Sequence, residues 1–147
     1  LPTEGRRVVS SRTAKLMGQA LKTVPREGGT APQTALEHYT VAGKTGTAQK
    51  VGVVGKDRHG KDKMGYRRGA YFTSFCGFFP ADDPELCILV LFDEPKRGYY
   101  GGTVAGPVFQ RIARRAAKYL NIAPEPGLMK ELELSGLSSG RTTTSRQ

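Results

Sequence analysis

Two apolar segments joined by a short turn constrain the fold of this chain more than any other feature. Residues 71–79 read Tyr-Phe-Thr-Ser-Phe-Cys-Gly-Phe-Phe, and residues 86–92 read Leu-Cys-Ile-Leu-Val-Leu-Phe. Both contain many residues that favour strands, and the segment between them, Pro-Ala-Asp-Asp-Pro at 80–84, has the composition of a turn. The sequence therefore predicts an antiparallel hairpin. Because the second segment is almost wholly apolar, it predicts a central strand that is covered on both faces.

Two helices are predicted on either side of this hairpin. A serine at position 10 or 11 caps the first helix, which runs to about Val24 and is stopped by the proline that follows. The second helix, residues 107–120, begins with a proline and carries apolar residues at helical spacing. A short β-rich run also spans residues 39–42. The order helix, strand, long loop, strand, strand, helix predicts an α+β fold with helices flanking an antiparallel sheet.

A cation, two hydroxyls and a glycine occupy four consecutive positions, Lys44-Thr45-Gly46-Thr47, directly after the β-rich run. Lys44 offers a counter-charge for a carboxylate, and the two threonines offer hydroxyl donors. Gly46 lets a ligand approach the main chain closely. Such a segment suits a strand edge along which a peptide carboxylate lies. An ordinary exposed turn is the alternative for so short a motif.

Other site chemistries find little support in the sequence. Gly43-Lys44-Thr45 ends like a phosphate-binding P-loop, but that loop needs a glycine five residues before Gly43, where His38 stands. No cysteine or histidine pair has the spacing of a zinc site, so the sequence predicts neither a metal nor a cofactor. Cys76 and Cys87 are predicted to be small buried residues on neighbouring strands, with a disulfide as the alternative.

The chain resembles the carboxy-terminal part of the transpeptidase domain of class B penicillin-binding proteins, most closely those of the division-specific type. The resemblance runs in one consistent order over about residues 10–124, which makes it far more specific than the Lys-Thr-Gly tripeptide alone. The matching stretches are Gly28-Gly29-Thr30-Ala31, residues 41–49, residues 74–80, Asp93-Glu94-Pro95, residues 99–109 and Leu120-Asn121-Ile122.

This resemblance implies a β-lactamase/transpeptidase-like fold and a serine acyl-transfer reaction. In the family, the serine of a Ser-x-x-Lys motif attacks the D-Ala-D-Ala bond of a peptidoglycan stem peptide, and the acyl group then passes to a neighbouring amine. The resemblance implies that Lys44 assists electrostatically and in proton relay. It also implies that Thr45, Gly46 and Thr47 bind the donor's terminal carboxylate. The backbone N–H of Thr47 would form half of the oxyanion hole.

The implied partners are the stem peptide, β-lactams as its acylating mimics, the remainder of the transpeptidase domain, and membrane proteins of the division complex. No nucleic acid is expected among them. The implied location is extracytoplasmic, with a membrane anchor upstream of Leu1. No apolar run in the chain reaches the length needed to cross a bilayer.

The chain departs from the family pattern at the residues that carry out the covalent step. No serine is followed three residues later by lysine, and no Ser-x-Asn occurs. Ser11 comes nearest, but Ala14 stands where lysine is required. The sequence therefore predicts that the nucleophile lies outside this chain, and that the chain alone is inactive. It also begins without methionine, so we expect a fragment or one piece of a larger polypeptide.

The predicted domain boundary falls near the end of the second helix. Residues 1–122 form the partial transpeptidase domain, and residues 123–147, rich in Pro, Gly, Ser and Thr, form a flexible tail. Three strands and two helices would leave one sheet edge unpaired, which in the family is covered by strands from earlier in the chain.

The charge of the chain supports a second hypothesis. The formal net charge is +10, and residues 50–68 carry seven Lys or Arg against two Asp. These residues are predicted to form a mobile, solvated loop, because four glycines interrupt them. The alternative function is a basic, non-catalytic binding module for nucleic acid or an anionic surface.

Overall fold

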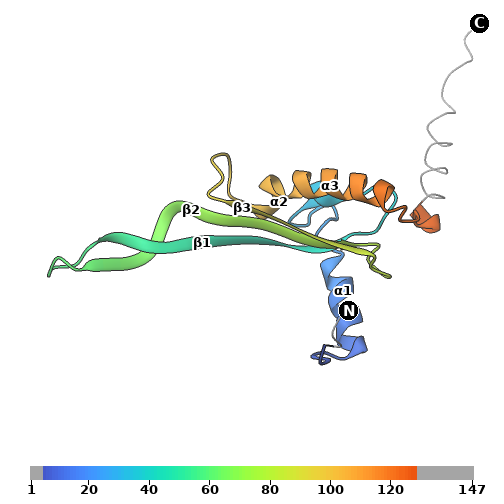
Figure 1. Ribbon diagram of the computed structural model, residues 1–147, viewed down its shortest axis with the longest axis horizontal. Coiled ribbons are helices and arrows are strands. Elements are labelled where there is room, and N and C mark those ends of the chain that lie inside the picture. Colours follow the sequence, from blue (N-terminus) through green and yellow to red (C-terminus); the bar gives the residue numbers. More distant parts are fainter. Residues whose placement is uncertain (1–4, 129–147) are drawn as a thin grey trace, which may run out of the picture.

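The structure, a computed structural model, describes residues 5–128 as a three-stranded sheet with helices on both sides (Figure 1). The elements are α1 (Ser11–Leu21), η1 (Pro32–Thr34), β1 (Ala42–Lys56), β2 (Asp62–Phe79), β3 (Leu86–Asp93), α2 (Gly101–Val104) and α3 (Gly106–Tyr119). The predicted helices and strands are confirmed in their order, but the long loop predicted between the first two strands is not, and two short helical segments, η1 and α2, are additional. Most of the predicted tail lies outside the described residues.

The sheet is antiparallel throughout, in the order β1-β2-β3. β2 and β3 form the predicted hairpin, with Phe75 opposite Val90. The prediction that residues 86–92 form a central, doubly covered strand is wrong. β3 lies at the sheet edge, and Leu89 and Leu91 are 62% and 54% exposed. The reason is that α3 covers only one face of β3, so every second apolar side chain faces solvent in the described chain.

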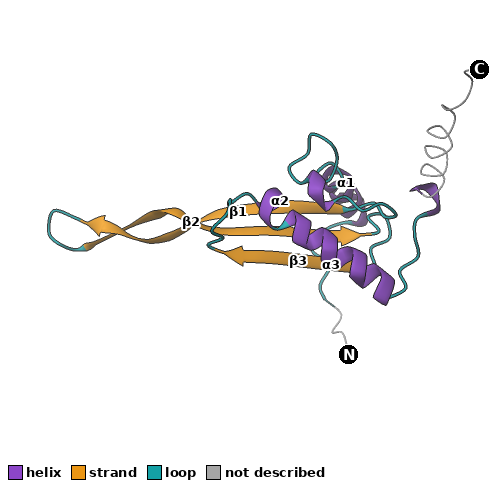
Figure 2. Cartoon of the chain, turned by 90° about the horizontal axis from the view of Figure 1, so that it is seen from above, coloured by secondary structure: helices purple, strands orange, loops and turns teal. Residues whose placement is uncertain are grey.

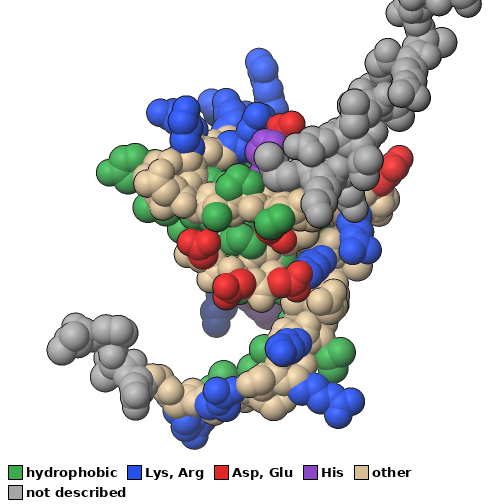
Figure 3. All heavy atoms as spheres, turned by 90° about the vertical axis from the view of Figure 1, so that its right-hand side faces the viewer, with side chains coloured by type: hydrophobic (Ala, Val, Ile, Leu, Met, Phe, Trp, Pro, Cys, Tyr) green, Lys and Arg blue, Asp and Glu red, His purple; other side chains and the backbone are tan. Residues whose placement is uncertain are grey.

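The core lies between the sheet and α3, which runs across one face of the strands (Figure 2). Phe75 of β2 and Phe109 of α3 are fully buried and meet edge to face, with ring centroids 4.7 Å apart. Gly77 allows this contact, because a Cβ there would lie 2.6 Å from the Phe75 ring and 3.0 Å from that of Phe109. Lys and Arg side chains group over the outer surface where α3 lies (Figure 3).

The first helix ends earlier than the sequence predicts. Ser10 caps α1 by accepting a hydrogen bond from the Thr13 N–H at 3.1 Å, as expected, but the helix ends at Leu21 rather than near Val24. α1 projects from the face of the sheet opposite α3 and has no buried residue (Figure 1). Its Leu16 and Met17 are therefore exposed in the described chain, although their spacing is that of a packed helix.

The largest correction concerns residues 50–68, which we call the hairpin arm. The sequence predicts a loop here, but β1 and β2 continue as a two-stranded ribbon beyond the end of β3, and the turn occupies only residues 57–61 (Figure 1). Gly52 and Gly65 lie opposite each other within the ribbon. The glycines therefore sit in paired strand positions and in the turn, rather than marking a single long loop.

The two cysteines are also placed differently from the prediction. Cys76 and Cys87 are exposed and form no disulfide, and their Sγ atoms lie 3.9 Å apart. Side chains alternate across a sheet, so Cys76 faces away from α3 while its neighbour Phe75 packs against the helix. The expectation of buried cysteines is wrong because this face is open in the described chain.

Ion pairs fix the base of the hairpin arm. The Lys50 ammonium lies 2.5 Å from Asp93 and 2.9 Å from Glu94, and Arg67 lies 3.1 Å from Glu94. The hydrogen bond from Lys50 holds the pKa of Glu94 below its usual range, and the bond to Asp93 is the main cause that raises the pKa of Lys50. These contacts join the arm to the end of β3.

We therefore expect the base of the arm to loosen in acid. Because the folded pKa of Glu94 is lowered, its stabilising contribution is present above the ordinary carboxyl pKa of about 4.3 and is lost as the pH falls through the lowered value. The raised pKa of Lys50 matters only in strongly alkaline solution. Below about pH 4, arm amides should lose protection against hydrogen exchange, measured relative to the intrinsic exchange rate at each pH. A Lys50→Met variant should lack this additional step, and an unchanged step in that variant would contradict the assignment.

Candidate functional site

The four residues of the Lys-Thr-Gly motif lie in the inner half of β1, in extended conformation. β1 is an edge strand, because among the described residues it pairs only with β2. The other edge of Lys44–Thr47 is therefore free to accept an additional extended segment. The motif therefore lies on a strand edge, as the sequence predicts, and the alternative of an ordinary turn is wrong.

The motif side chains divide between the two faces of the sheet. Thr45 and Thr47 share the α3 face, since they lie opposite Phe75 and Thr73 of β2. Lys44 belongs to the other face, and its ammonium bends back to donate to the Thr45 carbonyl at 3.0 Å. Lys44 is exposed. A charged group is therefore held beside the strand backbone, within reach of a ligand on its free edge.

Each motif hydroxyl contacts a segment that is distant in the sequence. The Thr45 hydroxyl lies 3.4 Å from the Thr30 hydroxyl, and the Thr47 hydroxyl accepts a hydrogen bond from the Gly101 N–H at 3.3 Å. Sequence reasoning missed Thr30 as part of this group, although the turn that contains it was singled out. The structure thus brings four hydroxyl or amide groups together around β1.

Glycines allow the close approach of backbones at this point. A Cβ on Gly101 would lie 2.2 Å from the Ser74 carbonyl oxygen and 2.9 Å from that of Gly46. A Cβ on Gly46 would lie 2.5 Å from the Ser74 hydroxyl. The lack of a side chain at Gly46 is therefore needed for its packing against Ser74 of β2, as well as for the close approach of a ligand. The start of α2 rests on the motif strand and limits its movement.

Three tyrosines flank this arrangement. Tyr71 and Tyr99 stack with ring centroids 4.7 Å apart, and Tyr100 lies 4.5 Å from Tyr99. The Thr73 hydroxyl donates to the Tyr99 carbonyl at 2.8 Å, which fixes the loop to the sheet. The hydrogen bond to Tyr100 raises the pKa of Tyr99 further above its ordinary value near 10. The tyrosines form an aromatic border beside the α2 end of the motif.

No nucleophile with an adjacent base was found within residues 5–128. Ser74 lies on β2 directly opposite Gly46. The only cysteine near the motif, Cys76, has its pKa raised by desolvation of its thiol and by its hydrogen bond with Cys87. A raised pKa reduces the thiolate fraction, which disfavours nucleophilic attack. The same described residues contain no cluster of His, Cys, Asp and Glu able to hold a metal, and no helix among them is long and apolar enough to span a membrane.

Sequence comparisons agree on one family. A model of the family described as "Penicillin binding protein transpeptidase domain" matches residues 1–114. Stage V sporulation protein D of Bacillus subtilis is 40% identical over 124 residues, which cover 84% of this chain and 18% of that protein. The probable peptidoglycan D,D-transpeptidase PenA of Neisseria flavescens is 36% identical over 122 residues, covering 82% of this chain and 28% of that protein. The chain spans less than a third of the length of these relatives.

Solved structures agree with the sequence comparisons. The transpeptidase domain of penicillin-binding protein 3 from Burkholderia pseudomallei superposes with a TM-score of 0.69 at 37% identity, covering 85% of this chain and 35% of that domain. Penicillin-binding protein 3 of Mycobacterium tuberculosis in complex with ampicillin gives a TM-score of 0.63 at 33% identity, covering 84% of this chain and 28% of that one. The predicted β-lactamase/transpeptidase-like fold is thereby confirmed. This chain belongs to the penicillin-binding protein transpeptidase domain family.

Proposed function

We propose that this chain forms the Lys-Thr-Gly wall of a peptidoglycan D,D-transpeptidase. The observation that carries the proposal is the free edge of β1 at Lys44–Thr47, in a chain of this family. A donor stem peptide lies along that edge as an additional strand. Its terminal carboxylate is bound by the Thr45 and Thr47 hydroxyls and by the charge of Lys44.

The reaction is acyl transfer through a serine that the remainder of the transpeptidase domain supplies. The serine oxygen attacks the carbonyl of the D-Ala-D-Ala bond, the terminal D-Ala leaves, and an amine of a neighbouring strand later displaces the serine. Lys44 stabilises the developing negative charge and assists the proton relay. The Thr47 backbone N–H supplies one donor of the oxyanion hole. Such preorganised donors give the largest catalytic contribution in many acyl transfers.

The same wall accounts for the proposed ligands and setting. β-Lactams acylate the serine as mimics of the donor, with their carboxylate bound to Thr45 and Thr47. Because the substrate is part of the cell wall, the site works on the extracytoplasmic side, in a membrane-anchored enzyme. Membrane proteins of the division complex are the further partners.

A chimeric domain tests this proposal. Residues 10–124 replace the equivalent segment of the Burkholderia pseudomallei transpeptidase domain, which supplies the earlier part of the fold. We expect a fluorescent penicillin to label the chimera covalently and to leave the isolated 147-residue chain unlabelled, because the chain has no Ser-x-x-Lys motif. Labelling of the isolated chain, or a folded chimera that does not label, would overturn the proposal.

A basic binding module is the second candidate, favoured by the cations of the hairpin arm. Binding to nucleic acid should weaken steeply as salt is added, whereas covalent penicillin capture should not. Tyr66 is the only aromatic side chain of the arm, which leaves little surface on which bases could stack. We therefore propose that the arm does not bind nucleic acid.

A further inference from the structure

The strand that carries the Lys-Thr-Gly wall continues into the hairpin arm. β1 runs from Ala42 to Lys56, and its pairing with β2 is interrupted only by register shifts between Gln49 and Val51 and between Val53 and Gly55. β3 pairs with β2 only from Phe72 to Phe79. The free edge of β1 therefore leads from the wall directly to the tip of the arm.

The direction of a bound peptide follows from this arrangement. A peptide that pairs antiparallel with β1 places its C-terminus near the start of β1 and its earlier residues toward the end of β1. If its terminal carboxylate is held at Thr45 and Thr47, the residues before it approach Val51, and the polymer that carries the peptide continues toward Lys56. A polymer-bound substrate is thereby directed along the arm.

The arm carries positive charge that the protein itself does not neutralise. Two of its seven cations, Lys50 and Arg67, pair with carboxylates at the base, and Lys56 pairs with Asp62 at 2.5 Å. The other four have no ion pair among the described residues. They are Arg58, Lys61, Lys63 and Arg68. Arg58 and Lys61 lie in the turn and Lys63 lies two residues after it, so the tip attracts carboxylates.

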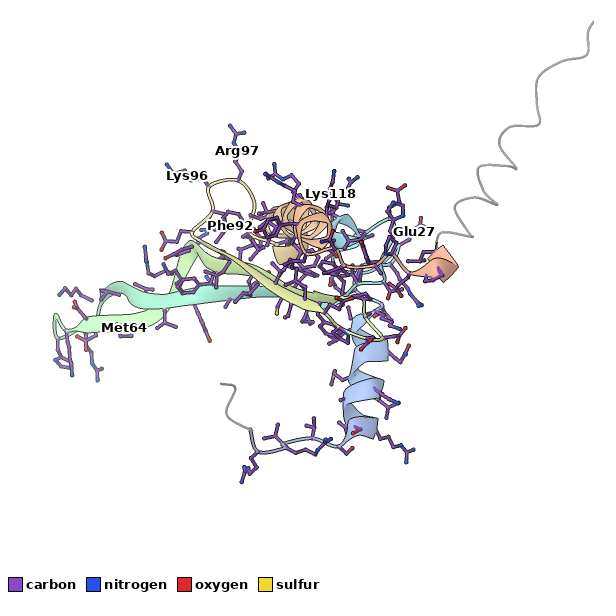
Figure 4. All side chains as sticks on the ribbon, turned by 45° about the vertical axis from the view of Figure 1, so that its right-hand side comes forward. Glu27, Met64, Phe92, Lys96, Arg97 and Lys118 are labelled. Atoms are coloured by element: carbon purple, nitrogen blue, oxygen red, sulfur yellow. The ribbon has the colours of Figure 1, made fainter. Side chains whose placement is uncertain are left out.

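Apolar side chains cover one face of the arm. Val51 lies opposite Tyr66 and Val53 lies opposite Met64, and residues two apart on a strand share a face. All four side chains are more than half exposed, and Met64 lies far from α3 in Figure 4. A two-stranded hairpin is marginally stable in water by itself, so a ligand that covers this face would also stabilise the arm.

We propose that the hairpin arm is a second docking surface for the acidic stem peptides of polymeric peptidoglycan, adjoining the Lys-Thr-Gly wall. The inference rests on the proposed function and adds a partner surface to it. The backbone of the peptide at the wall follows the edge of β1. Carboxylates of neighbouring stem peptides on the same polymer meet the cations at the tip, and their methyl groups contact the apolar face. A small β-lactam reaches only the wall and does not need the arm.

Sedimentation with purified sacculi, stripped of attached polymers, tests the arm with the full 147-residue chain. Replacing Arg58, Lys61 and Lys63 together by glutamate should raise the concentration for half-saturation about tenfold. The matched control carries Arg111→Glu, Arg114→Glu and Arg115→Glu on the outer face of α3, where all three are exposed. It changes the net charge equally and should shift binding less than about twofold. Circular dichroism checks that both variants fold.

Chemical amidation of the sacculus carboxylates should weaken binding of the unaltered chain as much as the triple variant does. Equal losses in the tip variant and the α3 control would overturn the proposal, because they would indicate attraction by net charge alone. Anionic phosphatidylglycerol vesicles that bind the chain as well as sacculi do, with the same loss in the tip variant, would also overturn it. Penicillin labelling of the chimera is the separate measurement. If the chimera is labelled but the tip variants bind sacculi normally, only the docking role of the arm is rejected. If the chimera is not labelled, the proposed function is rejected.

Discussion

In the chimeric transpeptidase domain, replacing Lys44 by methionine should slow acylation by penicillin about 100- to 1,000-fold. Methionine keeps the length and the apolar stem of the side chain but removes the ammonium. The lost charge lies beside the free edge of β1, where negative charge develops on the attacked carbonyl and its leaving group. The second-order rate constant of labelling, measured from the time course of fluorescence on the protein band, gives the effect directly.

A matched control separates this role from general charge. Lys63→Met removes an exposed ammonium from the same sheet, at the far end of the arm, and should leave penicillin acylation within about twofold. Lys44→Arg keeps the charge in a different geometry and should recover only part of the rate. If Lys44→Met acylates as fast as the unaltered chimera, the assignment of a catalytic role to this residue is wrong.

Replacing Thr47 is expected to slow acylation less than replacing Lys44, and its effect is harder to interpret. Its hydroxyl already accepts a hydrogen bond from Gly101, so a valine there would leave that amide unpaired as well as removing a ligand contact. A loss of acylation in Thr47→Val would therefore combine both effects. Lys44 is the cleaner test, because within the described residues its ammonium hydrogen-bonds only to the neighbouring Thr45.

Sequence reasoning succeeded where the pattern is local. The hairpin of residues 71–79 and 86–92 and the last helix were predicted because apolar spacing and turn residues are read within a short window. The Lys44–Thr47 motif was placed on a strand for the same reason. Each of these elements carries its own signal in consecutive residues.

The errors arose where the answer depends on residues distant in the chain. An apolar strand has the same composition at an edge as in the centre, so Leu89 and Leu91 gave no sign that their face is open. The glycines of the arm resembled a loop because pairing of Gly52 with Gly65 is visible only in the register. Thr30 was missed because it reaches Thr45 across a tertiary contact.

The second large effect is expected on the stability of the core between α3 and the sheet. Replacing Phe109 by alanine should lower the free energy of unfolding of the chain by about 3–5 kcal/mol. Phe109 is fully buried and meets Phe75 edge to face, and the glycine at position 77 leaves its ring in direct contact with the sheet. Gly77 has no side chain that could fill the space left by the Phe109 ring, so a cavity remains between α3 and β2. Denaturant unfolding, followed by circular dichroism, measures the change.

Leu89→Ala is the matched control, because it removes a large apolar side chain from the open face of the same sheet. Leu89 is 62% exposed, so its truncation should cost less than about 1 kcal/mol. A loss as large as that of Phe109→Ala would mean that a second copy covers this face in solution, and the loss would then depend on protein concentration. The comparison of the two variants therefore measures the stability of the core under α3 and tests whether the opposite face of the sheet is exposed. That face carries Lys44, so its accessibility bears directly on how the rest of a transpeptidase domain could close over the wall.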